Sequence, residues 1–123
     1  MAKIVLIGLE QSTAGQICSA LAVERHQIQH RPADLPIRDL RDADMVFAGG
    51  ERARYLPILR RVREVRPSLP FVVVTWIADT KEWLDALEAG ATDYCSVPIE
   101  TRQIHWLMES ALLRRVSAGT HPA

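Results

Sequence analysis

The chain has 123 residues, of which 48% are hydrophobic, so it suits a single domain that buries one core without disulfides or a metal. Fifteen basic and fifteen acidic residues cancel, and this balance favours neither nucleic acid nor an anionic membrane surface as a partner. No apolar run is long enough for a membrane span or a signal-peptide core. Cys18 and Cys95 fall in a helical and a strand pattern, so we expect buried free thiols and a cytoplasmic location.

The first half of the chain alternates between strand and helix patterns. Apolar runs at residues 4–7 and 45–48 predict buried parallel strands. Between them, Thr13 and Gln16 can form a capping box, and a helical stripe follows at Ala14, Ile17, Cys18 and Leu21. Residues 26–43 alternate poorly and contain two prolines, which predicts an edge strand and then a short helix.

The second half continues the alternation, with strands predicted at residues 71–74 and 94–97. A helix is predicted before these strands, with its apolar stripe at Leu56, Leu59, Val62 and Val65. Pro67 ends this helix, and Pro57 is compatible with it only in the first turn. Asp79 and Glu82 open the next helix, which Gly90 ends. The last helix has its stripe at Ile104, Leu107, Met108, Ala111 and Leu112. Residues 117–123 are expected to fray.

Strands that alternate with helices predict a doubly wound α/β sheet, and one motif identifies a family. Residues 90–98 read Gly-Ala-Thr-Asp-Tyr-Cys-Ser-Val-Pro, which resembles the Gly-Ala-x-Asp-Tyr-x-x-Lys-Pro stretch of bacterial response-regulator receiver domains, with Val97 at the lysine. Residues 71–75 resemble the fourth receiver strand, ending in its switch threonine, Thr75. The resemblance covers residues 1–116 and implies a flavodoxin-like (CheY-like) parallel sheet of five strands in the order 2-1-3-4-5.

The resemblance also implies which residues should carry chemistry, and these are missing. In receivers a histidine kinase phosphorylates an aspartate after the third strand, with Mg²⁺ held by an acidic pair after the first. Here Gly8 and Leu9 occupy the positions of the acidic pair, Gly49 occupies that of the acceptor and Val97 that of the lysine. Of the family's functional residues, only the switch threonine, Thr75, is kept. The resemblance therefore implies an atypical receiver of two-component or phosphorelay signalling that accepts no phosphoryl group, binds no metal or cofactor and is not an enzyme.

Three residues near these positions leave alternatives open. Glu10 and Glu51 could form a substitute metal site, or they could be two solvated acids. Trp76 follows the switch threonine, where receivers usually have a small residue, and it either lies over the vacated pocket as a plug or covers the end of the sheet. Val97-Pro98 could keep the cis peptide of the family.

The expected partner is a protein. Trp106 falls off the buried stripe of the last helix and should be exposed, unless it packs over the tail. In receivers the face formed by the fourth helix, the fifth strand and the fifth helix is the docking and dimer surface; Tyr94 matches its switch aromatic, and Trp83 either borders it or is core. This face would bind a second copy, a histidine kinase or an output domain.

Two other interpretations concern charge and ligands. Residues 8–15 join the first strand to the first helix, where related folds hold phosphate, so the second interpretation is a small-ligand or nucleotide-binding flavodoxin-like domain. Helix capping is the simpler role for Ser12 and Thr13. Six arginines between residues 52 and 66 and the acids between residues 79 and 93 are read as a solvated face with some ion pairs, and not as a nucleic-acid site.

Overall fold

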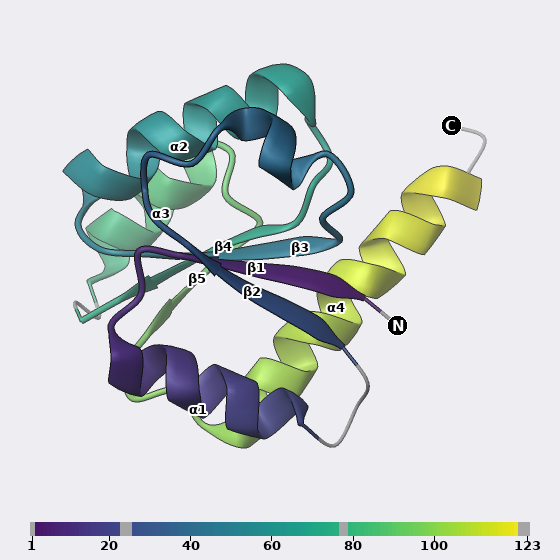
Figure 1. The fold of residues 1–123 in the computed structure, drawn as a ribbon. Helices are drawn as coiled ribbons and strands as arrows, with labels where there is room; N and C mark the ends of the chain where they lie inside the picture. Colours follow the sequence, from purple (N-terminus) through teal and green to yellow (C-terminus); the bar gives the residue numbers. More distant parts are fainter. Residues whose placement is uncertain (1, 23–25, 77–78, 121–123) are drawn as a thin grey trace.

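The computed structural model describes residues 2–22, 26–76 and 79–120, with side chains in the last helix as far as Ala111. Five parallel strands form one sheet in the order β2-β1-β3-β4-β5, which confirms the predicted flavodoxin-like architecture (Figure 1). The strands are β1 (Lys3–Ile7), β2 (Gln27–Arg31), β3 (Met45–Gly49), β4 (Phe71–Thr75) and β5 (Asp93–Ser96). The predicted edge strand is therefore β2, and a short 3-10 helix, η1 (Ile37–Leu40), follows it.

Helices cover both faces of the sheet. Figure 1 shows α1 (Gln11–Leu21) and α4 (Thr101–Thr120) on one face, and α2 (Arg52–Val65) and α3 (Thr80–Glu88) on the other. Successive strand residues point to opposite faces, so Ile4 and Leu6 pack with α1 and α4 while Val5 and Ile7 pack on the side of α2. Both layers leave the carboxyl ends of the strands free of helix, and loops from β1, β3 and β4 meet there.

The capping box predicted for α1 is wrong. Glu10 is the N-cap in extended conformation, and its carbonyl oxygen accepts from the Ala14 amide at 2.9 Å, so the helix begins at Gln11. Thr13 is therefore the third helical residue, and only 5% of it is exposed. Its hydroxyl cannot serve as a cap, because it lies inside the helix.

The phase predicted for α2 is only partly right. Leu59 and Val62 are buried as expected, but 56% of Val65 is exposed, and the remaining buried positions are Tyr55 and Ile58. Pro57 is the sixth helical residue, beyond the first turn. The sequence predicts Pro57 in the first turn because proline lacks an N–H donor. In the structure α2 loses only one backbone hydrogen bond at Pro57 and continues.

The ends of the other helices follow the sequence more closely. The Asp79 side chain accepts from the Lys81 amide at 2.8 Å as the N-cap of α3, and Gly90 follows that helix with φ +109°. The last stripe is buried at Ile104, Leu107, Met108 and Ala111. Leu112 lies outside the residues whose side chains are described. The helix α4 extends to Thr120, so the segment predicted to fray begins as helix.

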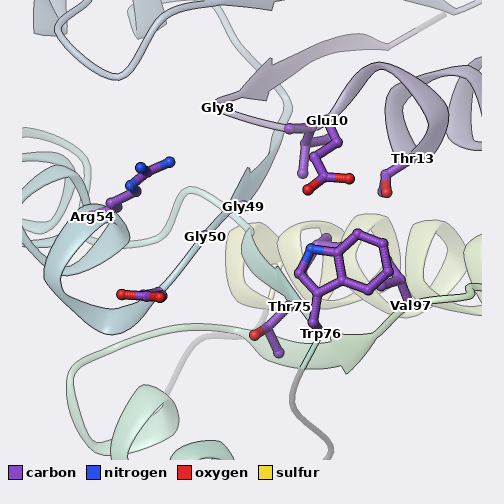
Figure 2. Close-up of a pocket in the computed structure, with 12 residues that line it drawn as sticks. Gly8, Glu10, Thr13, Gly49, Gly50, Arg54, Thr75, Trp76 and Val97 are labelled. Atoms are coloured by element: carbon purple, nitrogen blue, oxygen red, sulfur yellow. The ribbon is translucent and has the colours of Figure 1, made fainter.

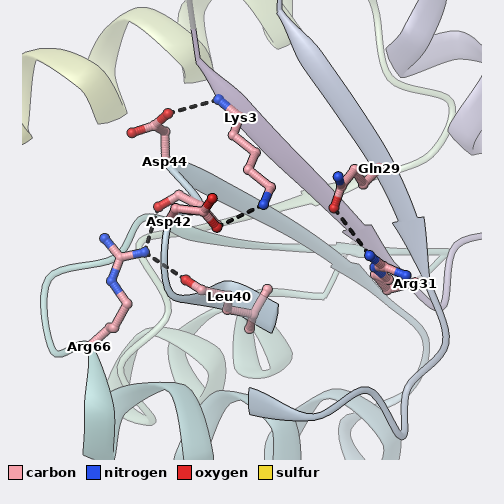
Figure 3. A network of polar contacts seen from close by, with 8 residues as sticks. Lys3, Gln29, Arg31, Leu40, Asp42, Asp44 and Arg66 are labelled. Carbon is pink, nitrogen blue, oxygen red and sulfur yellow. Dashed lines mark hydrogen bonds and ion pairs between the residues drawn. The ribbon is translucent and has the colours of Figure 1, made fainter. Parts of the chain in front are cut away.

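A polar network ties the amino end of the sheet together (Figure 3). The Lys3 amide donates to Asp44 Oδ2 at 2.7 Å, and Lys3 Nζ pairs with Asp42 Oδ1 at 2.7 Å. The hydrogen bond from Lys3 lowers the pKa of the Asp42 carboxyl. Arg66 Nη1 donates to the Leu40 carbonyl oxygen at 2.8 Å. Asp44 is thus a structural acid at the end of the sheet opposite to the loops that carry the candidate site.

The arginines of α2 are partly structural as well. Arg63 donates to the carbonyl oxygens of Gly90 at 2.8 Å, Leu69 at 2.7 Å and Arg66 at 3.2 Å, and its burial lowers the pKa of its guanidinium. Arg52 pairs with Asp85 of α3 at 3.3 Å, as the expected contact between these neighbouring helices. The arginine cluster therefore binds carbonyls and one acid of its own domain. None of the described helices combines the length and apolarity that crossing a membrane would need.

Candidate functional site

A pocket of about 380 Å³ opens at the carboxyl ends of β1, β3 and β4 (Figure 2). It contains every position at which the family resemblance placed phosphorylation chemistry. The lining residues are Gly8, Leu9, Glu10, Thr13, Gly49, Gly50, Glu51, Arg54, Val74, Thr75, Trp76 and Val97. A ligand in a doubly wound sheet is expected at this edge.

Leu9 and Gly49 are packed against each other at the centre of this edge. A Cβ built on Gly49 would lie 2.6 Å from Leu9 Cδ2 and 3.1 Å from the Gly8 carbonyl oxygen, and real Cβ atoms do not approach other atoms as closely as 2.6 Å. The Leu9 side chain therefore occupies the space through which any side chain at residue 49 would extend. Gly8 has φ +64°, a conformation that favours glycine.

Thr75 and Tyr94 form a contact beside the pocket. Only 8% of Thr75 is exposed at the end of β4, and Thr75 and Tyr94 line a second cavity of about 260 Å³. Burial raises the pKa of Tyr94, and its interaction with Thr75 opposes that shift. Tyr94 packs against the core on the α2 side of the sheet. The ring is thus turned inward, toward the threonine.

Trp76 and Val97 form the wall opposite α1. The Val97 amide donates to the Thr75 carbonyl oxygen at 2.8 Å, and the Val97-Pro98 peptide is cis, as in the family motif. Trp76 is 64% exposed and lines the pocket without filling it, as Figure 2 shows. Of the two interpretations of Trp76, its place at the vacated pocket agrees with the first, and the indole forms one wall of an open pocket instead of filling it.

The charged residues of the pocket do not form a magnesium site. Glu10 and Glu51 are the N-caps of α1 and α2, and neither carboxylate hydrogen-bonds its helix. A hard cation needs several convergent oxygen ligands, and within the described ranges no three histidine, cysteine, aspartate or glutamate side chains come together as a ligand group. The residues at this edge do not fit Mg²⁺ in the way a receiver site would.

Two pocket residues escaped the sequence reasoning. The sequence favours a capping role for Thr13, but this residue stands three places after Glu10, so both lie on the same side of the first turn of α1. In the sequence Arg54 is one of a group of arginines, but in the structure its Cβ and Cγ lie 3.3 and 3.8 Å from a Cβ built on Gly50, so the side chain covers the loop after β3. The signal that could have found both is their position in the first turn of a helix that starts at the carboxyl edge.

The predicted interface residues do not form one cluster with the pocket. Trp106 on α4 is 55% exposed and Trp83 on α3 is 40% exposed, so the alternative that Trp83 is core is wrong. These helices lie on opposite faces of the sheet, with β5 at the edge between them (Figure 1). Tyr94 is the inward residue of that edge. The exposure of Trp106 agrees with its place off the buried stripe, and its role as an interface stays a prediction.

The chain is similar to known response-regulator proteins. It is 26% identical over 104 residues to the transcriptional regulatory protein ZraR of Salmonella typhimurium, and equally to that of Salmonella typhi, with 81% of the chain covered. It spans 22% of the length of these relatives. No protein-family model matches the chain.

Solved structures agree on the fold. A response-regulator receiver domain from Clostridium thermocellum aligns with a TM-score of 0.80 at 19% identity, over 94% of this chain and 97% of that one. The receiver domain of Francisella response regulator 1452 aligns with a TM-score of 0.81 at 12% identity, over 94% and 99% of the two chains. The chain therefore has the fold of receiver domains.

Proposed function

We propose that this chain is a receiver-like domain of two-component signalling that accepts no phosphoryl group and acts by contact with another protein. The observation that carries the proposal is the Leu9–Gly49 contact. An acyl phosphate needs a carboxylate, and Gly49 at the acceptor position has no side chain, while Leu9 Cδ2 lies where one would begin. Val97 supplies no cation at the lysine position, and the carboxylates nearby do not converge on a metal.

The inward position of Tyr94 supports the same conclusion. In receivers the switch threonine and the aromatic residue respond to the phosphoryl group. Here Thr75 and Tyr94 line one cavity, and Tyr94 packs against the core, in a chain with no acceptor. In our proposal Thr75 and Tyr94 keep one arrangement. The surface around β5 therefore does not depend on phosphorylation.

The partner would bind beside β5. Trp106 and Trp83 expose indole rings on the two helices that flank this strand, and aromatic residues are enriched among interface residues that dominate binding energy. The similar proteins include transcriptional regulatory proteins several times longer than this chain. The proposed partner is therefore a second copy, a histidine kinase or an output domain.

Phosphorylation chemistry tests the proposal directly. The protein is incubated with Mg²⁺ and acetyl phosphate, or with beryllofluoride, beside a receiver that has the acceptor aspartate. We expect an unchanged intact mass and unchanged tryptophan fluorescence, while the control receiver responds. A phospho-adduct on this chain would contradict the proposal, because no residue at the acceptor position can form one.

A further inference from the structure

The pocket at the carboxyl edge carries charges that the protein itself does not neutralise. Glu10 lies at the start of α1 and Arg54 in the first turn of α2, and both line the pocket. Figure 2 shows Arg54 across the pocket from Glu10. Among the described residues, neither side chain has an ion pair or a hydrogen bond. Both side chains are exposed and therefore accessible, and opposite charges on opposite walls match a ligand that carries both charges.

A ligand with a single charge fits this lining less well. Glu10 and Glu51 outnumber Arg54, so a simple anion would meet net negative side-chain charge. A simple cation would meet Arg54 and the first turns of α1 and α2, whose amide groups favour negative charge. A zwitterion reduces both conflicts, because its carboxylate can lie at Arg54 and the first turn of α2 while its ammonium group lies at the Glu10 carboxylate.

Thr13 offers a hydroxyl group to a ligand in the pocket. It is 5% exposed, and its hydroxyl points into the pocket toward Trp76 (Figure 2). No hydrogen bond joins this hydroxyl to any residue that the structure describes. No buried side-chain oxygen of the described residues lacks a partner, so the Thr13 hydroxyl is reached by solvent from the pocket and is open to a ligand there. The hydroxyl lies on the same wall as Glu10 and can accept a hydrogen bond from the same ammonium group.

The remaining surface of the pocket is apolar. Leu9, Val74 and Val97 join the Trp76 indole in the lining, and the volume of about 380 Å³ is in the range of small-molecule sites. We infer that the pocket binds a zwitterionic α-amino acid with an apolar side chain. The ammonium group lies at Glu10 and Thr13, the carboxylate at Arg54, and the side chain against Leu9, Val97 and the indole. The inference rests on the proposed function, since the space is free only where no phosphoryl group forms.

Trp76 provides the readout. Its fluorescence is isolated by Trp83→Phe and Trp106→Phe, which change exposed residues outside the pocket. The probes are L-leucine, isopentylamine, which lacks the carboxylate, and 4-methylpentanoate, which lacks the ammonium group. We expect a saturable fluorescence change with L-leucine, and binding weaker by about tenfold or more with either analogue, because each loses one charge-assisted contact. Titration calorimetry on the unsubstituted chain should give the same order.

Charge-neutral variants test the assigned residues. Glu10→Gln and Arg54→Gln should each weaken L-leucine binding by about tenfold or more. The matched controls are Glu109→Gln and Arg102→Gln, exposed residues of α4, which should leave binding unchanged. An absence of saturable binding up to about 10 mM would overturn the inference, and so would an amine or an acid that binds as tightly as the amino acid. Failure of the proposed function is a separate result, a phospho-adduct in the mass spectrum.

Discussion

The Leu9 side chain holds the place of a side chain at Gly49, with Cδ2 only 2.6 Å from where a Cβ would be. The two residues are therefore coupled. Gly49→Ala should lower the free energy of unfolding by about 1–3 kcal/mol through overpacking. Leu9→Ala in the same chain should recover part of this loss, with a coupling of about 0.5 kcal/mol or more in a double-mutant cycle measured by urea unfolding. Gly15→Ala is the control, since nothing lies within 4 Å of its Cβ, and it should not destabilise.

Restoring the acceptor alone should not restore phosphorylation. Gly49→Asp adds a carboxylate next to Leu9 without the lysine or the acidic pair, so we expect a lower melting temperature and no adduct with acetyl phosphate. Intact-mass spectrometry and thermal melting on one sample measure both. A phosphorylated Gly49→Asp variant with an unchanged melting temperature would show that the site is complete apart from its acceptor.

Arg63 should contribute more to stability than its neighbours on α2. Its guanidinium donates to three backbone carbonyl oxygens, which would be left without this donor in Arg63→Met. We expect a loss of about 2–4 kcal/mol in the free energy of unfolding. Arg60→Met, at an exposed position of the same helix, should change it by less than about 0.5 kcal/mol. Equal effects of the two variants would refute the structural role of Arg63.

Alkaline pH should weaken the fold through Cys95. Burial raises the pKa of this thiol above its ordinary value of 9.0, to about 12. Between these values the unfolded chain loses the proton and the folded chain keeps it, so stability is complete below about pH 9 and falls as the pH rises toward 12. The slope from this group is at most about 1.4 kcal/mol per pH unit. Urea unfolding from pH 8 upward should show a shallower slope for Cys95→Ala than for Cys18→Ala, whose thiol is only half-buried.

Trp106→Ala separates an interface from a packing role. Because the indole is 55% exposed, the substitution should change the free energy of unfolding by less than about 1 kcal/mol. If Trp106 anchors a partner or a second copy, association should weaken by about 2 kcal/mol or more in sedimentation equilibrium. Val65→Ala, at an equally exposed apolar residue of α2, is the control. Unchanged association with a large fall in melting temperature would refute the interface.

The sequence predicts the sheet better than it predicts the site. Each buried strand is a continuous apolar run, whereas the strand order comes from the family that residues 90–98 resemble and not from the hydrophobic pattern. Which side of α2 is buried is harder to predict. Tyr55 and Ile58 suit burial against the sheet as well as Leu56 and Val65 do, and only packing decides which of them are buried. Helix starts are the weakest point. A threonine near a helix start favours a cap in sequence reasoning, but the Glu10 carbonyl begins α1 and leaves Thr13 buried at the pocket.

The charged residues at the two ends of the sheet differ in how much their substitution affects the fold. At the amino end, Lys3 and Asp44 hold neighbouring strands to each other, so a substitution there alters the fold itself. At the carboxyl end, Glu10 and Arg54 hold nothing together within the described chain. Mutation can therefore alter or reverse these charges at little cost in stability, and the domain can acquire a new specificity while its scaffold stays the same.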